Sequence, residues 1–89
     1  MMGVSAANGH LPKWRVQKLS PADRKRLGRA IQHHRVLLHL TQEQLAEQAG
    51  LDRRFIQKVE AGQLGASVAV LKRLRRALKI AWDDLLAGI

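Results

Sequence analysis

The 89-residue chain contains no cysteine, which excludes a disulfide framework, a zinc site built on thiolates and a cysteine nucleophile. Aromatic residues are also scarce, since Trp14, Phe55 and Trp82 are the full set. Proteins that bind unpaired nucleic acid stack its bases on aromatic side chains, so this small set argues against such an activity.

Long apolar runs are absent as well. The longest, residues 68–71, has four residues, whereas a membrane-spanning helix needs roughly 20. The first 11 residues lack the basic-then-apolar layout of a signal peptide. We therefore expect no membrane partner and a cytoplasmic, nucleoid-associated location.

Positive charge is abundant and unevenly distributed. The chain has 16 Lys and Arg against 7 Asp and Glu, a net charge of +9, with +7 in residues 1–40, −1 in 41–62 and +3 in 63–89. Such a surplus attracts polyanions. Nucleic acid is the commonest partner of this kind and an anionic membrane surface the next, while a merely solubilising excess is the alternative.

The chain divides into an arm and one domain. Residues 1–19 show no hydrophobic period and are interrupted by Gly3, Asn8, Gly9 and Pro12, so we expect a flexible basic arm there. An apolar content of 46% is normal for a folded protein. Residues 20–89 therefore form the predicted domain, which is small enough for an oligomer to help its stability.

The sequence of this domain predicts five short helices and no strand. Capping residues and apolar spacings of three and four predict helices from Ser20 to near Leu38, over 42–49, from Arg53 to about Ala61, over 68–78 and around 81–86. Thr41 and Gln44 form a capping box. The apolar positions of the first helix are Leu27, Ile31, His34 and Leu38.

The second and third helices are joined by a very short link. A link of about four residues, 49 to 52, forces a steep crossing. Ala46 is small enough for the close approach, and Gly50 tolerates the positive φ that the turn needs. Ile56 and Val59 anchor the inner face of the third helix. This is the layout of a helix-turn-helix, whose second helix can enter the major groove.

The same residues resemble a known family. Two motifs carry the resemblance: residues 41–51 (TQEQLAEQAGL) and then Phe55-Ile56-x-x-Val59-Glu60-x-Gly62. Together with matching flanks over about 24–88, they resemble the Cro/C1-type (XRE) helix-turn-helix family. The resemblance implies an all-α, five-helix, lambda-repressor-like DNA-binding domain. Within the family the chain is most similar to small stand-alone regulators, such as restriction-modification controllers and phage repressor-like proteins. These usually act as homodimers on palindromic operators.

Four positions depart from the family pattern. His39 stands where glycine is usual, and Arg75 where a small apolar residue is usual. Ala66 replaces a frequent proline, and Ala81 replaces a capping residue such as serine. These departures concern helix ends and packing, not the third helix.

Arg53 and Arg54 are the strongest candidates for reading bases. Two arginines at a helix N-terminus oppose the helix dipole, which favours a functional role over stability. Arginine can pair bidentately with guanine. Two solvated charges are the alternative. The resemblance adds Gln57 as a base-reading residue.

Phosphate contacts are expected around this helix. The resemblance places Gln42 on the DNA backbone, next to the free amides of a helix N-terminus. Lys58, Gln63 and Ser67 are further candidates. The alternatives are an ordinary N1 glutamine for Gln42, plain helix surface for Lys58 and a simple cap for Ser67.

The resemblance also implies two structural roles. Arg35 and Glu60 look like the family's ion pair, which ties the first helix to the third. The C-terminal apolar residues are expected at a two-fold dimer contact, with closure of the monomer core as the alternative; they are Trp82, Leu85, Leu86 and Ile89.

No metal, cofactor or enzymatic site is expected. The four histidines include no i, i+4 pair and have no cysteine or carboxylate cluster beside them; they are His10, His33, His34 and His39. Asp83 and Asp84 fit the helix dipole better than catalysis. We interpret a basic run on the fourth helix as a solvated face, with a distal phosphate contact as the alternative. The run comprises Lys72, Arg73, Arg75, Arg76 and Lys79.

The leading hypothesis is therefore a sequence-specific, double-stranded-DNA-binding transcriptional regulator that acts as a homodimer. Two alternatives stay open. One is an antitoxin that binds DNA and a toxin partner. The other is a protein-interaction adaptor that keeps the fold without reading DNA.

Overall fold

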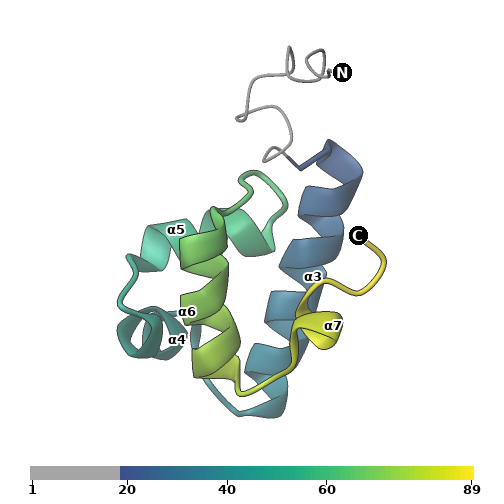
Figure 1. The fold of residues 1–89 in the computed structure, drawn as a ribbon. Coiled ribbons are helices and arrows are strands. Elements are labelled where there is room, and N and C mark those ends of the chain that lie inside the picture. Colours follow the sequence, from purple (N-terminus) through teal and green to yellow (C-terminus); the bar gives the residue numbers. More distant parts are fainter. Residues whose placement is uncertain (1–18) are drawn as a thin grey trace, which may run out of the picture.

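The computed structural model describes residues 19–89, and these form an all-helical domain (Figure 1). The expected basic arm, including His10 and Trp14, lies outside the described residues apart from Leu19. Residues 19–89 contain no strand, and their helices are α3 (Pro21–Leu37), α4 (Gln42–Ala49), α5 (Arg53–Glu60), α6 (Val68–Leu78) and α7 (Trp82–Leu85). The predicted five-helix, all-α architecture is confirmed.

Side-chain caps set most of the helix starts. Ser20 Oγ accepts from the Asp23 amide at 3.1 Å, and Ser67 Oγ accepts from the Val70 amide at 3.2 Å. Thr41 and Gln44 satisfy each other's backbone amides at 3.0 and 2.9 Å, which is the predicted capping box. Each cap replaces a hydrogen bond that the first turn of a helix cannot make internally. The sequence expectations for these three helices are confirmed.

The core lies between α3 and the other helices. In Figure 1 the long α3 stands on one side, α4 and α5 on the other, and α7 packs beside α3. The fully buried side chains come from all five helices and include Leu27, Ile31, Leu45, Ile56, Val59, Leu74, Leu78 and Leu85. Within this single cluster α5 packs on both α3 and α4, and α6 closes over α4.

α3 approaches the backbone of α5 closely at Gly28. A Cβ atom at this position would lie only 2.6 Å from the Glu60 carbonyl oxygen, a distance that real Cβ atoms do not show. The absence of a side chain therefore lets the backbone of α3 touch the carboxyl end of α5.

Two helix ends lie within one residue of the sequence prediction. Leu38 continues the apolar spacing of the first helix, but α3 ends at Leu37 and Leu38 is 37% exposed. The next residue, His39, takes φ +58°, so the chain leaves the helical path directly after Leu38. α7 starts at Trp82 without a side-chain cap, because Ala81 has none to offer.

Leu19 belongs to the domain and not to the arm. Its side chain packs against the core cluster, and its carbonyl accepts a hydrogen bond from Arg24 Nη1 at 3.1 Å. Within residues 19–89, no helix is both long enough and apolar enough to cross a bilayer.

Candidate nucleic-acid interface

The outer face of α5 carries four exposed polar side chains. Arg53 and Gln57 are one helical turn apart, as are Arg54 and Lys58, so the four form two adjacent rows. The opposite face buries Ile56 and Val59. Within residues 19–89, neither arginine lies within salt-bridge distance of a carboxylate. The two guanidinium groups are therefore free to bind an external acceptor.

The turn before α5 aims these rows outward. Gly50 ends α4 with φ +69°, and the Leu51 amide donates to the Ala46 carbonyl at 2.8 Å. Asp52 then caps α5, since its Oδ1 accepts from the Arg54 amide at 2.7 Å. The Asp52 carboxylate also offsets the unfavourable placement of two arginines at the helix N-terminus. The short link predicted from the sequence thus joins α4 to α5 without intervening structure.

A polar network holds α5 against α3 and α4. Arg35 Nε donates to Glu60 Oε2 at 2.7 Å and Arg35 Nη2 donates to Glu60 Oε1 at 3.0 Å, a bidentate pair. Arg35 Nη1 also donates to the Leu40 carbonyl at 2.8 Å. The Glu60 side chain is 4% exposed, so these donors compensate for the burial of its carboxylate. The structure thus brings Arg35 and Glu60 together at the end of α5.

Gln42 joins the same network, which sequence reasoning missed. Its Nε2 donates to Glu60 Oε1 at 3.0 Å, from the first position of α4. An amide nitrogen carries two protons, and one of them is used here. The second proton and the first backbone amides of α4 are the groups that could hold a phosphate. No local signal pairs Gln42 with Glu60, because they are 18 residues apart.

The loop between α5 and α6 carries the other two phosphate candidates. Gly62 takes φ +76°, and the Gln63 amide donates to the Lys58 carbonyl at 2.9 Å, which leaves the Gln63 side chain exposed. Ser67 caps α6, which is the alternative to a phosphate contact that the sequence left open. Its hydroxyl proton is not used by the cap, so Ser67 retains one donor.

The C-terminal apolar residues do not share one environment. Leu85 is fully buried in the monomer core, so the expectation that it contacts a second protomer is wrong. Its place in the four-residue α7 turns it directly onto α3. Trp82 and Leu86 are half-buried, and Ile89 is 43% exposed. These three side chains keep surface that a partner could cover.

Several exposed apolar side chains were not singled out by sequence reasoning. Val36 and Leu37, at the end of α3, are 54% and 60% exposed, and Val68, at the start of α6, is 63% exposed. Their exposure follows from tertiary packing, because each lies in an apolar stretch that the sequence alone does not orient.

Within residues 19–89, no group of three or more potential metal ligands is present.

Comparison with known proteins places the chain in a family. The family model described as "Helix-turn-helix", HTH_3, matches residues 31–85. The chain belongs to this HTH_3 (XRE-type) helix-turn-helix family of DNA-binding transcriptional regulators. A curated relative, an uncharacterised HTH-type transcriptional regulator from Methanothermobacter thermautotrophicus, is 44% identical over 48 residues, which are 54% of this chain and 70% of that protein.

Solved structures agree with this assignment. The restriction-modification controller protein C.AhdI from Aeromonas hydrophila is 36% identical, with a TM-score of 0.69 over 72% of this chain and 97% of that one. The hypothetical transcription factor NHTF from Neisseria is 30% identical, with a TM-score of 0.69 over 85% of each chain. The clp gene regulator ClgR from Corynebacterium glutamicum is 27% identical, with a TM-score of 0.68 over 71% of this chain and 67% of that one. The resemblance found in the sequence is confirmed.

Proposed function

We propose that this chain is a sequence-specific regulator of transcription that inserts α5 into the major groove of a palindromic operator. The observation that carries the proposal is the outer face of α5. Arg53, Arg54 and Gln57 are exposed there with no carboxylate partner for either arginine within residues 19–89. Arginine donates bidentately to the O6 and N7 atoms of guanine, and glutamine pairs similarly with adenine.

Phosphate contacts supply the affinity in this proposal. Gln42 begins α4, before α5 in the chain. Lys58 lies on α5 itself, and Gln63 lies in the loop between α5 and α6. Contacts of this kind position the protein without reading sequence. Binding should therefore weaken steeply as salt rises, because each neutralised phosphate releases a counterion.

A homodimer completes the proposed operator complex. Trp82, Leu86 and Ile89 are the C-terminal apolar residues that retain exposed surface, and we assign them to the two-fold contact. Two copies of α5 would then lie about 34 Å apart, one turn of DNA.

Selection of bound sequences from a random duplex pool at near-physiological salt tests the proposal. The expected result is a palindrome whose half-sites are about one turn apart. Arg53→Ala should relax one position in each half-site and cost about 1–3 kcal/mol on the preferred sequence. Arg29→Ala, which removes the same charge from the exposed side of α3, is the matched control and should leave the motif unchanged.

Two outcomes would overturn parts of the proposal. Recovery of no motif, with binding that disappears as salt rises, would leave only electrostatic attraction and reject sequence-specific reading. A motif that Arg53→Ala and Arg29→Ala preserve equally would reject the assignment of Arg53. Sedimentation of the Leu86→Ala variant tests the dimer contact separately, because an unchanged dimer would exclude this surface.

A further inference from the structure

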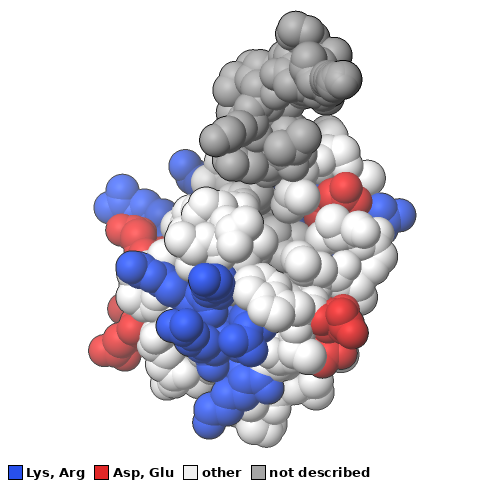
Figure 2. Space-filling view, in the orientation of Figure 1, with Lys and Arg blue, Asp and Glu red and all other residues white. Residues whose placement is uncertain are grey.

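The basic side chains of α6 gather on its outer face. Lys72, Arg73 and Arg76 are exposed on the helix and Lys79 is exposed at its end, while α6 itself contains no acidic residue. Figure 2 shows Lys and Arg concentrated over α6, with the acidic residues at the edges of that face. In the part of the chain that the structure describes, none of these four forms a salt bridge.

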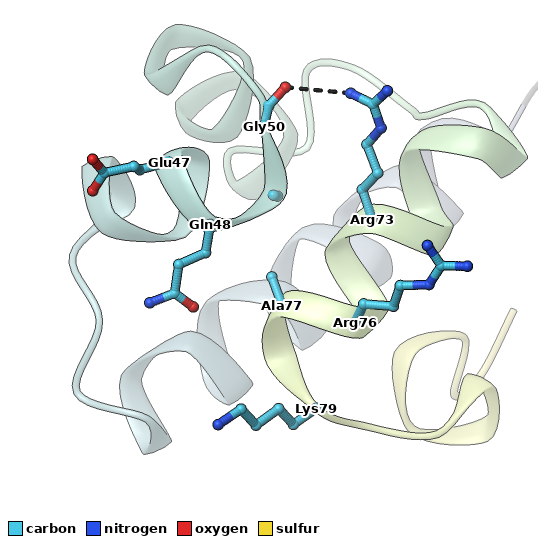
Figure 3. Close-up of a pocket in the computed structure, with 8 residues that line it drawn as sticks. Glu47, Gln48, Gly50, Arg73, Arg76, Ala77 and Lys79 are labelled. Carbon is cyan, nitrogen blue, oxygen red and sulfur yellow. Dashed lines mark hydrogen bonds between the residues drawn. The ribbon is translucent and has the colours of Figure 1, made fainter.

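A groove lies beside this basic face. It has a volume of about 450 Å³ and runs between the last turn of α4 and the second half of α6 (Figure 3). Its small lining residues, Ala49, Gly50 and Ala77, leave room for a foreign chain. Arg73, Arg76 and Lys79 line the α6 side, and Glu47 and Gln48 line the α4 side.

Stability explains one of these cations but not the others. Arg73 Nη1 donates to the Gly50 carbonyl at 3.3 Å (Figure 3). A cation at the carboxyl end of α4 also complements the helix dipole. No hydrogen bond or ion pair within residues 19–89 engages the charged groups of Arg76 and Lys79. These two are available to a ligand.

The groove lies away from the proposed operator surface. α4 has eight residues, so its two ends are about 12 Å apart. Gln42 is at the end proposed to hold DNA, whereas the groove is at the other end. Glu47 on the rim would repel a phosphate backbone, which is negative along its whole length, but would pair with a basic residue of a protein partner.

We propose that the α4–α6 groove binds an acidic segment of a partner protein. Arg73, Arg76 and Lys79 follow one another at three-residue steps, a spacing that matches carboxylates three or four residues apart on a partner helix. Arginine binds carboxylates bidentately. Recognition of an acidic motif by clustered arginines is an established binding mode. This inference does not depend on operator binding.

Selection from a phage-displayed library of random peptides about 15 residues long, enough for a marginal helix, tests the proposal. The folded wild-type protein is the bait, and the double variant Arg76→Gln/Lys79→Gln is the counter-selection. Lys25→Gln/Arg29→Gln on α3 removes the same charge and is the control. Enriched peptides should carry Asp or Glu at helical spacing. They should bind the groove variant at least about tenfold more weakly than the control, by fluorescence anisotropy at physiological salt, where distant charges are screened.

Each other result would overturn the proposal. Absence of acidic enrichment, or equal losses in both variants, would show only the general attraction of a basic protein. If the groove variant lost operator affinity as strongly as peptide affinity, the groove would be a DNA surface. If its sedimentation changed relative to the control, the groove would be a self-association surface. Operator selection with the same two variants separates a failure here from a failure of the proposed function.

Discussion

Two half-buried arginines, Arg35 near the end of α3 and Arg75 near the end of α6, use the same local device. Each donates from Nη1 to the carbonyl five residues ahead, at 2.8 Å to Leu40 and 3.2 Å to Ile80. Each is followed four residues later by a non-glycine residue at φ +58°, His39 or Lys79. The two helix ends are therefore built alike.

Their tertiary surroundings are different. Arg35 meets Glu60 and, through it, Gln42, so three helices share one polar network. Arg75 lies 5.3 Å from the Trp82 ring centroid, and its buried Nε has no hydrogen-bond partner. The comparison teaches that the α3–α4–α5 junction is fixed by a network of charged hydrogen bonds, whereas the arginine at the turn from α6 to α7 has one backbone acceptor and an aromatic ring. The following variants test this difference.

Glu60→Ala should give the largest effect. It leaves Arg35 half-buried and unpaired and removes the partner of Gln42, so we expect a loss of about 3–5 kcal/mol in the free energy of unfolding. Urea denaturation followed by far-UV circular dichroism measures it. Asp23→Ala breaks the more exposed pair with Arg26 and should cost under about 1 kcal/mol. Equal losses in the two variants would contradict the special role of the network.

Gly28→Ala should be the next most damaging substitution. The added methyl group would press on the Val59 and Glu60 carbonyls, and overpacking of this kind costs about 1–3 kcal/mol. Gly65→Ala is the control, because its Cβ would meet only Leu19 at ordinary contact distances. The same denaturation assay should show little change there. A stable Gly28→Ala variant would mean that α3 and α5 can separate without cost.

Lys79→Gly should stabilise the protein slightly. A left-handed conformation costs a non-glycine residue about 1–2 kcal/mol, and glycine removes this cost. Glycine also raises the conformational entropy of the unfolded chain, which offsets part of the gain. We expect a net gain of up to about 1 kcal/mol. Lys72→Gly, inside the same helix, should instead lose about 1 kcal/mol. A loss in both variants would show that the Lys79 side chain itself stabilises the end of α6.

Arg75→Leu should have the smallest effect, within about 1 kcal/mol of the wild type. The substitution removes the hydrogen bond to Ile80 and the cation–π contact, which together contribute about 2–3 kcal/mol. It also relieves the unpartnered Nε, whose burial costs a similar amount, and adds apolar contact. Thermal and urea unfolding would both report the sum. A loss as large as that of Glu60→Ala would make the two junctions equivalent.

The sequence predicted what depends on neighbouring residues. The caps at Ser20, Thr41 and Ser67 and the turn at Gly50 all involve partners within five residues. These features set the starts and ends of helices, and with the apolar spacing they determine the fold class.

The rest depended on contacts between distant segments. Gln42 meets Glu60 across 18 residues, and Leu85 is buried because α7 packs on α3. Leu38 fits the helical period but lies just past the end of α3, where it remains exposed. Period and propensity do not encode where a helix is placed, so these features required the structure. The groove beside α6 was missed for the same reason, since α4 and α6 form it together.

The contact at Gly28 separates the position of α5 from its outer chemistry. Backbone atoms, and not side chains, set the distance between α3 and the carboxyl end of α5. Arg53, Arg54, Gln57 and Lys58 point away from that contact and take no part in the core. Exchanging these four residues would therefore alter what the helix recognises at little cost in folding. The position of α5 in the domain is therefore independent of its exposed residues, which suits the domain to acquiring new binding specificities.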